Sequence, residues 1–248
     1  MMENINLVVS SSPHIHTNET VRRTMLDVII ALLPACIASV LFFGFRSVAV
    51  ILTAVAACMV SEWAFQKLTH KETTVSDLSA AVTGVLLGLN MPSTIPLWML
   101  VIGSVFSIVV VKQLYGGLGK NFLNPAMAGR CFMIIAWAGA MTTWGGNVFV
   151  DAQSGATPLE VMKSGAEGVL PSVFNAFIGF EHGSIGEVSA LCLVLGFVYL
   201  MIRRVVSIRI PAVYIISFAV LTYFFGDNIF ETATFLTSEN FDTYPLFP

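Results

Sequence analysis

Charged residues are scarce in this sequence, and their scarcity excludes an ordinary soluble domain. The length of 248 residues would allow one or two soluble domains, but only 11% of the residues are charged and 56% are hydrophobic. The formal net charge of -3 gives no basic surface for nucleic acid, so no nucleic-acid partner is expected. The composition predicts an all-α integral membrane protein whose surroundings are the lipid bilayer.

Motifs for soluble cofactors and metals are also missing. The four cysteines show no C-x-x-C spacing and lie in apolar runs, so an iron-sulfur cluster held by this chain alone is not expected. His14 and His16 have no third ligand near them, which argues against a metal site. The glycine-rich stretch 112–130 is no Walker loop, because Asn121 stands where Ser or Thr should hold magnesium. No cleavable leader is recognisable, so we expect the first membrane helix to act as the insertion signal.

Long uncharged runs are what the sequence has instead. A membrane helix needs roughly 20 apolar residues, and Pro92 and Pro96 divide the longest run into two segments. Asn124 and Pro125 have the pattern of a helix N-cap followed by proline at the first helical position. Seven helices are predicted, at residues 28–45, 47–67, 78–91, 97–111, 125–141, 188–202 and 210–226. The segment 78–91 is short, and it could instead be re-entrant.

The distribution of Lys and Arg favours seven spans. With seven, the cytoplasmic side carries Arg22, Arg23, Lys67, Lys71, Lys112, Lys120, Arg130, Arg203, Arg204 and Arg209, and the other side carries Arg46 and Lys163. A re-entrant segment 78–91 would remove this bias, which the positive-inside rule requires. We therefore predict a cytoplasmic arm at 1–21, five helices within 22–143, an extracytoplasmic loop at 144–186, two helices within 187–226, and an extracytoplasmic tail at 227–248.

One polar motif interrupts the hydrophobic chain. It has the order D-x-x-S-G-A-T and consists of Asp151, Ser154, Gly155, Ala156 and Thr157. This order resembles the signal at which an extracytoplasmic flavin transferase attaches FMN to a threonine hydroxyl. The two small residues would fit a narrow enzyme site, and Pro158 biases Thr157 toward an extended conformation that displays its hydroxyl. The alternative is a small-residue loop without a covalent role.

Further blocks of sequence extend the resemblance. They are S-P-H-I at 12–15, DVIIALLP at 27–34, DLSAAVTGVLLGLNMP at 77–92, the stretch 112–130, SGATPL at 154–159, GSIGEVSAL at 183–191 and R-I-P at 209–211. Together they resemble the D-subunit family of the Rnf electron-transport complex. They are similar, more distantly, to the B subunit of the sodium-pumping NADH:quinone reductase.

The resemblance implies a redox function. It implies a membrane subunit of an ion-translocating (Na+ or H+) ferredoxin:NAD+ oxidoreductase in a bacterial or archaeal plasma membrane, with other Rnf subunits and the flavin transferase as partners. Thr157 would carry covalent FMN, and a non-covalent riboflavin would be bound by residues that the sequence does not identify. A non-redox channel or transporter, and a structural scaffold, are the alternatives.

Two further expectations concern the C-terminal residues and four acidic residues near the predicted helices. The family implied by the resemblance continues with a second structural repeat, whereas residues 238–248 do not resemble that continuation, so we expect the second repeat to be missing. Asp27, Glu62, Asp77 and Glu187 are candidates for the ion path, because ionisable groups near a membrane are costly. The competing interpretation is that they are helix-end acids, and for Asp27 that it complements the helix dipole.

The predicted topology is testable by cysteine labelling. In a background whose four native cysteines are replaced by alanine, Ser154→Cys should react with a membrane-impermeant maleimide in intact cells, because the predicted loop 144–186 lies outside. His70→Cys, on the predicted cytoplasmic side, is the matched control and should react only after lysis. Protection of Ser154→Cys in intact cells would contradict the charge count.

Overall fold

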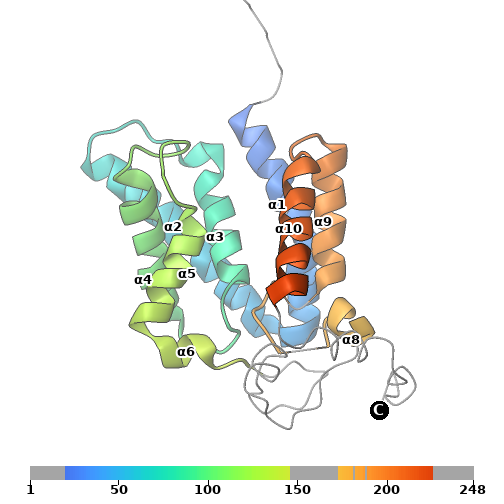
Figure 1. Cartoon of the computed structure of the whole chain (residues 1–248). Coiled ribbons are helices and arrows are strands. Elements are labelled where there is room, and N and C mark those ends of the chain that lie inside the picture. Colours follow the sequence, from blue (N-terminus) through green and yellow to red (C-terminus); the bar gives the residue numbers. More distant parts are fainter. Residues whose placement is uncertain (1–19, 146–172, 181, 188, 226–248) are drawn as a thin grey trace, which may run out of the picture.

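The computed structural model describes residues 20–145, 173–180, 182–187 and 189–225, and this part of the chain contains helices and no strands. Most of the predicted arm and the predicted tail lie outside these residues. Helices α2, α3, α4 and α5 form one packed group, and α1 connects it to α9 (Figure 1). The largest cluster of buried apolar side chains lies among α2, α3, α4 and α5. The predicted all-α architecture is confirmed for the described residues.

Helices α1 (Val21–Phe43) and α2 (Phe45–Leu68) are long and apolar enough to cross a membrane. The side chain of Thr20 caps α1 by accepting a hydrogen bond from the backbone N–H of Arg23 at 3.3 Å. The helix therefore begins seven residues earlier than the predicted residue 28 and adjoins the expected arm. Gly44 alone separates the two helices, with a φ of 67° that favours glycine.

Glycines allow α3 (Ser79–Leu89) to pack closely against α2. Gly84 and Gly88 form a G-x-x-x-G pair on one face of α3. A Cβ atom at Gly84 would lie 2.5 Å from the Cα of Val55, and one at Gly88 would lie 3.0 Å from the Cα of Ile51. The two backbones are therefore too close for a side chain at Gly84.

The next segment changes its helical type along its length. Helix α4 (Leu97–Val105) continues directly into the π-helix η2 (Phe106–Gln113). Helix α5 (Pro125–Ala136) begins with the predicted cap, since the Asn124 side chain accepts a hydrogen bond from the N–H of Ala126 at 3.0 Å. The single helix predicted for 125–141 is wrong, because Trp137 has a φ of −139° and separates α5 from α6 (Ala138–Thr142). The Trp137 ring packs edge-to-face against Trp98 and Phe132 at this break.

The remaining helices lie against α1 or on the outside. Helix α8 (Val173–Ile178) precedes α9 (Ala190–Ile202), which packs along α1 where Gly196 meets the backbone of Ala31. Helix α10 (Arg209–Phe225) exposes most of its described apolar side chains, including Ile210 at 75% and Tyr214 at 73%. Such a continuous apolar surface needs a lipid or protein partner, as expected for a membrane protein.

Two of the seven predicted spans correspond to short helices, and the count of seven stays a prediction. Helix α3 has 11 residues and α5 has 12, which correspond to about 17 and 18 Å of rise. A hydrocarbon core is about 30 Å thick. Both helices are therefore short for a span, although α3 carries the chain from one end of its helical group to the other (Figure 1).

The close contact between α2 and α3 gives a stability test. Gly84→Ala should lower the thermal unfolding midpoint in detergent, because its Cβ meets the Val55 backbone and overpacking costs about 1–3 kcal/mol. Gly139→Ala is the control, since nothing lies within 4 Å of a Cβ at that position. An unchanged midpoint for Gly84→Ala would show that α2 and α3 are farther apart.

Candidate functional site: a buried ionic cluster

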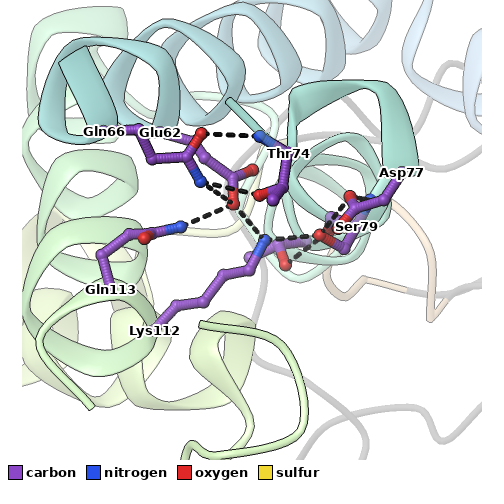
Figure 2. Close-up of polar contacts among 8 residues, drawn as sticks. Glu62, Gln66, Thr74, Asp77, Ser79, Lys112 and Gln113 are labelled. Atoms are coloured by element: carbon purple, nitrogen blue, oxygen red, sulfur yellow. Dashed lines mark hydrogen bonds and ion pairs between the residues drawn. The ribbon is translucent and has the colours of Figure 1, made fainter. Parts of the chain in front are cut away.

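The most unusual chemistry in the described residues is an ion pair enclosed among α2, α3 and η2. Lys112 Nζ lies 2.8 Å from Glu62 Oε1, and the two side chains are 2% and 0% exposed. Lys112 comes from η2 and Glu62 from the last turns of α2 (Figure 2). Two charges removed from water are stable only when they are paired and hydrogen-bonded, so the positions of α2 and η2 depend on each other here.

The π-helix explains why two neighbouring residues reach one carboxylate. Gln113 Nε2 donates to Glu62 Oε1 at 2.6 Å, alongside the ammonium of Lys112. Consecutive residues of an α-helix point about 100° apart, whereas the wider π-turn brings them closer in direction. A π-turn inside a helix is frequent at functional sites. Gln66 Nε2 completes the contacts of this oxygen at 3.4 Å.

A short polar chain connects the ion pair to the surface. Lys112 Nζ donates to Ser79 Oγ at 2.6 Å, and Ser79 Oγ donates to Asp77 Oδ1 at 2.6 Å. Asp77 ends the short 3-10 helix η1 (Val75–Asp77) and is half-buried. Leu78, which lies between Asp77 and Ser79, has a φ of 65°, a left-handed conformation that is uncommon for a bulky residue. The strained residue lets Asp77 Oδ1 also accept the N–H of Ser79 at 2.7 Å.

The second oxygen of Glu62, Oε2, is buried and has no hydrogen-bond partner among the described residues. A bare oxygen on a buried carboxylate is costly, and such groups call for an explanation. The cluster is therefore satisfied on one side of Glu62 only.

A second polar centre lies at the far end of α3. Arg130 Nη1 donates to Asn90 Oδ1 at 2.7 Å, and Asn90 Nδ2 donates to the carbonyl of Leu86 at 2.8 Å. Arg130 lies within α5, and none of the ion pairs formed by the described residues includes it. This guanidinium is therefore a positive charge inside the helical group whose observed partner is neutral.

The turn around Asn90 also holds both flanks of the segment that contains the predicted motif. Thr94 Oγ1 donates to the carbonyl of Thr143 at 2.8 Å. On the other flank, Ile185 N donates to Met91 O at 3.0 Å, and Gly186 N donates to Leu89 O at 2.7 Å. Residues 143 and 185 are thus fixed to the same turn.

A third centre joins α1 to α9. Asp27 is 4% exposed and receives two hydrogen bonds from Arg203 Nε at 3.3 Å and one from Arg203 Nη2 at 3.2 Å. Tyr199 donates its hydroxyl to the same carboxylate at 3.0 Å. The interpretation of Asp27 as a helix-dipole acid is wrong, because α1 begins six residues earlier and the carboxylate pairs with α9 instead.

Comparison with known proteins identifies the family. The family model described as NQR2, RnfD, RnfE matches residues 8–246. The chain belongs to the NQR2, RnfD, RnfE family. This membership and the two long apolar helices make it a membrane protein.

The chain is similar to D subunits of ion-translocating oxidoreductase complexes. The chain is 43% identical over 229 residues to the D subunit of an Na(+)-translocating ferredoxin:NAD(+) oxidoreductase complex from Acetobacterium woodii, covering 92% of the chain and 72% of the relative. It is 39% identical over 228 residues to the D subunit of a proton-translocating ferredoxin:NAD(+) oxidoreductase complex from Clostridium ljungdahlii, covering 88% and 69%. It is 36% identical to the D subunit of an ion-translocating oxidoreductase complex from Alcanivorax borkumensis, covering 84% and 68%.

The structure places the four acidic candidates, whereas the attachment motif is not described. The attachment motif, which comprises Asp151, Ser154, Gly155, Ala156 and Thr157, lies outside the described residues. Glu62 and Asp77 belong to the buried cluster, and Asp27 joins α1 to α9. Glu187 is exposed and accepts a hydrogen bond from Ser184 at 2.8 Å. Among the described residues, no group of three His, Cys, Asp or Glu side chains is arranged to hold a metal.

Sequence reasoning missed the partners of these acids. Lys112 was expected to be a loop charge on the cytoplasmic side, but it is buried at the end of η2. Arg130 lies within α5, inside the predicted helix 125–141, but its contact with Asn90 was not predicted. The available signal was the position of each cation directly beside an uncharged helical run. Nothing in the sequence indicates the contact of Ser79 with Lys112.

The ion pair gives a prediction with an internal control. Lys112→Met should lower stability by about 3–5 kcal/mol, because it leaves the Glu62 carboxylate buried without its cation. The double variant Glu62→Gln with Lys112→Met should recover part of this loss, since no charge remains buried. Thermal unfolding in detergent, analysed as a double-mutant cycle, measures the coupling. Additive effects of the two changes would contradict the pair.

Proposed function

We propose that this chain is a membrane redox subunit that carries FMN covalently on Thr157, within an ion-translocating ferredoxin:NAD+ oxidoreductase complex. It relays electrons between flavins and iron-sulfur centres of the complex and is not catalytically complete alone. The carrying observation is the family match over residues 8–246 together with two relatives named for this complex. The D-x-x-S-G-A-T motif adds the flavin to that assignment.

The residues near the motif's flanks are compatible with a bound flavin. Arg130 offers a guanidinium that no carboxylate of the described residues neutralises, and an FMN ester is negatively charged. Thr143 is bonded to the turn beside Asn90, and Thr157 follows it by 14 residues, so at most about 50 Å of extended chain joins Thr157 to this turn. The proposal therefore places the anionic flavin within reach of Arg130, and also of Arg46, which donates to the carbonyls of Ser93, Thr94 and Ile95. The flavin itself supplies one-electron chemistry, and the protein supplies position and charge.

Maturation and assembly follow from the same proposal. A flavin transferase would act on Thr157 from the extracytoplasmic side, and other Rnf subunits would supply the sites for ferredoxin and NAD. Apolar α10 offers a broad surface for lipid or a neighbouring subunit. A non-covalent riboflavin remains part of the proposal without assigned ligands.

The translocated ion calls for a polar path through the helices. The described residues contain one buried ion pair with an unpartnered oxygen, formed by Glu62 and Lys112. Ionisable groups at membrane depth mark ion or proton pathways by default. We assign ion handling to this cluster, which lies at the opposite end of α3 from Asn90.

The flavin assignment has a direct test. Co-expression of the chain with a flavin transferase should give a fluorescent band in a denaturing gel, because a phosphoester-linked flavin survives unfolding. Thr157→Ala should abolish the band, since the acceptor hydroxyl is lost. Thr142→Ala removes a threonine hydroxyl outside the motif and should leave the band unchanged. A band that persists in Thr157→Ala would overturn the assignment, and solute uptake by reconstituted protein that is indifferent to Thr157 would favour a channel. A chain that never carries flavin but is required for assembly of the complex would be a scaffold.

A further inference from the structure

A continuous hydrogen-bonded chain runs from the surface into the buried cluster. It begins at the half-buried Asp77, passes through the Ser79 hydroxyl and the Lys112 ammonium, and ends at Glu62 Oε1 (Figure 2). The three links measure 2.6, 2.6 and 2.8 Å. Exposure falls along this chain, to 3% at Ser79, 2% at Lys112 and 0% at Glu62. An ionised carboxylate of Asp77 or Glu62 can accept a proton, the Ser79 hydroxyl can donate and accept, and the Lys112 ammonium can accept one only after it has released one.

The composition of the cluster favours a proton over a metal cation. A hard metal cation needs several oxygen ligands, and Glu62 Oε2 is the one buried carboxylate oxygen among the described residues without a partner. The Lys112 ammonium lies 2.8 Å from the other oxygen of that carboxylate, so a metal ion would meet a like charge at close range. A proton needs a single oxygen, and loading it on Glu62 leaves the Lys112 ammonium beside a neutral acid, so the loaded cluster carries one added positive charge.

We propose that Glu62 is a proton-loading site that is filled from solvent through Asp77, Ser79 and Lys112. The inference rests on the proposed function, because ion translocation by the complex supplies the reason for loading a proton there. It deepens that function by naming the ion and its entry route. Lys112 is both the counter-charge of Glu62 and the last carrier.

The transfer balances without any change in oxidation state. The Lys112 ammonium breaks one N–H bond and gives the proton to Glu62 Oε1, forming a carboxylic acid and a neutral amine. Solvent first protonates the Asp77 carboxylate. The Ser79 hydroxyl, which donates to Asp77 in the structure, then turns toward the amine, gives it a proton and takes one from the Asp77 carboxylic acid, which becomes a carboxylate again. The net result is one proton moved from solvent to Glu62, with Lys112 again an ammonium.

Few other titratable groups of the described residues face Glu62. Lys112 faces it from η2, and Asp77 lies beyond Ser79 in η1. Cys58 is buried one turn earlier on α2 and interacts with both charges of the pair. The remaining contacts come from the neutral amides of Gln66 and Gln113. A protonation event in this cluster is therefore assignable to Glu62 by substitution.

Infrared difference spectroscopy on the full chain in liposomes tests the proposal. As pH is lowered, a carbonyl band of a protonated carboxylic acid should appear, shift in D2O, and be absent in Glu62→Gln. Ser79→Ala should slow hydrogen–deuterium exchange of this band at least tenfold, and Ser79→Thr should restore the rate because it keeps a hydroxyl. Ser107→Ala, which removes a buried hydroxyl that bonds the carbonyl of Gly103, should exchange at the wild-type rate.

Each outcome decides the matter. A Glu62 band whose exchange slows in Ser79→Ala, or in Asp77→Asn if the first variant does not fold, supports the route. The absence of a Glu62 acid band at every pH at which the protein stays folded overturns the proposal. Exchange that is as fast in Ser79→Ala as in the wild type also overturns it. A carboxylate band of Glu62 that responds to added Na+ but not to pH overturns it as well. The proposed function fails separately, if flavin fluorescence does not depend on Thr157, because the infrared measurement needs no flavin.

Discussion

The contact between Glu62 and Lys112 joins the two most deeply buried charged side chains among the described residues. Inside a membrane protein, a charge that is cut off from water must find its compensation within the protein. This pair draws together the end of α2, the end of η2 and the start of α3. Close packing at Gly84 and Gly88 holds α3 against α2, and Ser79 at the start of α3 contacts Lys112. The unusual π-turn then directs Lys112 and Gln113 toward the same oxygen.

The helical group has two polar ends with different chemistry. At one end of α3, an anion and a cation neutralise each other, and a serine and an aspartate connect them to the surface. At the other end, Arg130 meets a neutral amide, and the turn that carries this amide also fixes residues 143 and 185. The first end suits the movement of a small cation such as a proton. The second carries a positive charge that no carboxylate of the described residues neutralises, which is why the proposed function places an anionic cofactor near it.

The sequence predicted the elements more reliably than the contacts. Apolar runs predicted where helices lie but not all of their bounds, and the Asn124 cap correctly marked the start of α5, since both signals are local. The break at Trp137 was missed because it depends on packing against Trp98, which is distant in the sequence. For the same reason Asp27 was interpreted as a helix-end acid, although its partner Arg203 lies 176 residues away. Lys112 and Arg130 illustrate a further limit: charge at the edge of an apolar run does not reveal whether the side chain turns outward or inward.

The two ends of α3 also suggest how electron and ion movement can be linked in such a subunit. A change of charge near Arg130 alters the electrostatic potential along the helices, and this effect is weakly screened where water is excluded. The Glu62 and Lys112 pair lies at the Ser79 end of α3. The backbone of α3 is bonded to the Asp77 carboxylate at that end and to the N–H of Gly186 at the other. Under the proposed function, an electron on a flavin near Asn90 would favour an added positive charge in the cluster, and a proton on Glu62 would supply that charge. Coupling of this kind requires no large rearrangement of α3, only that the helix keep its two polar ends at a fixed separation.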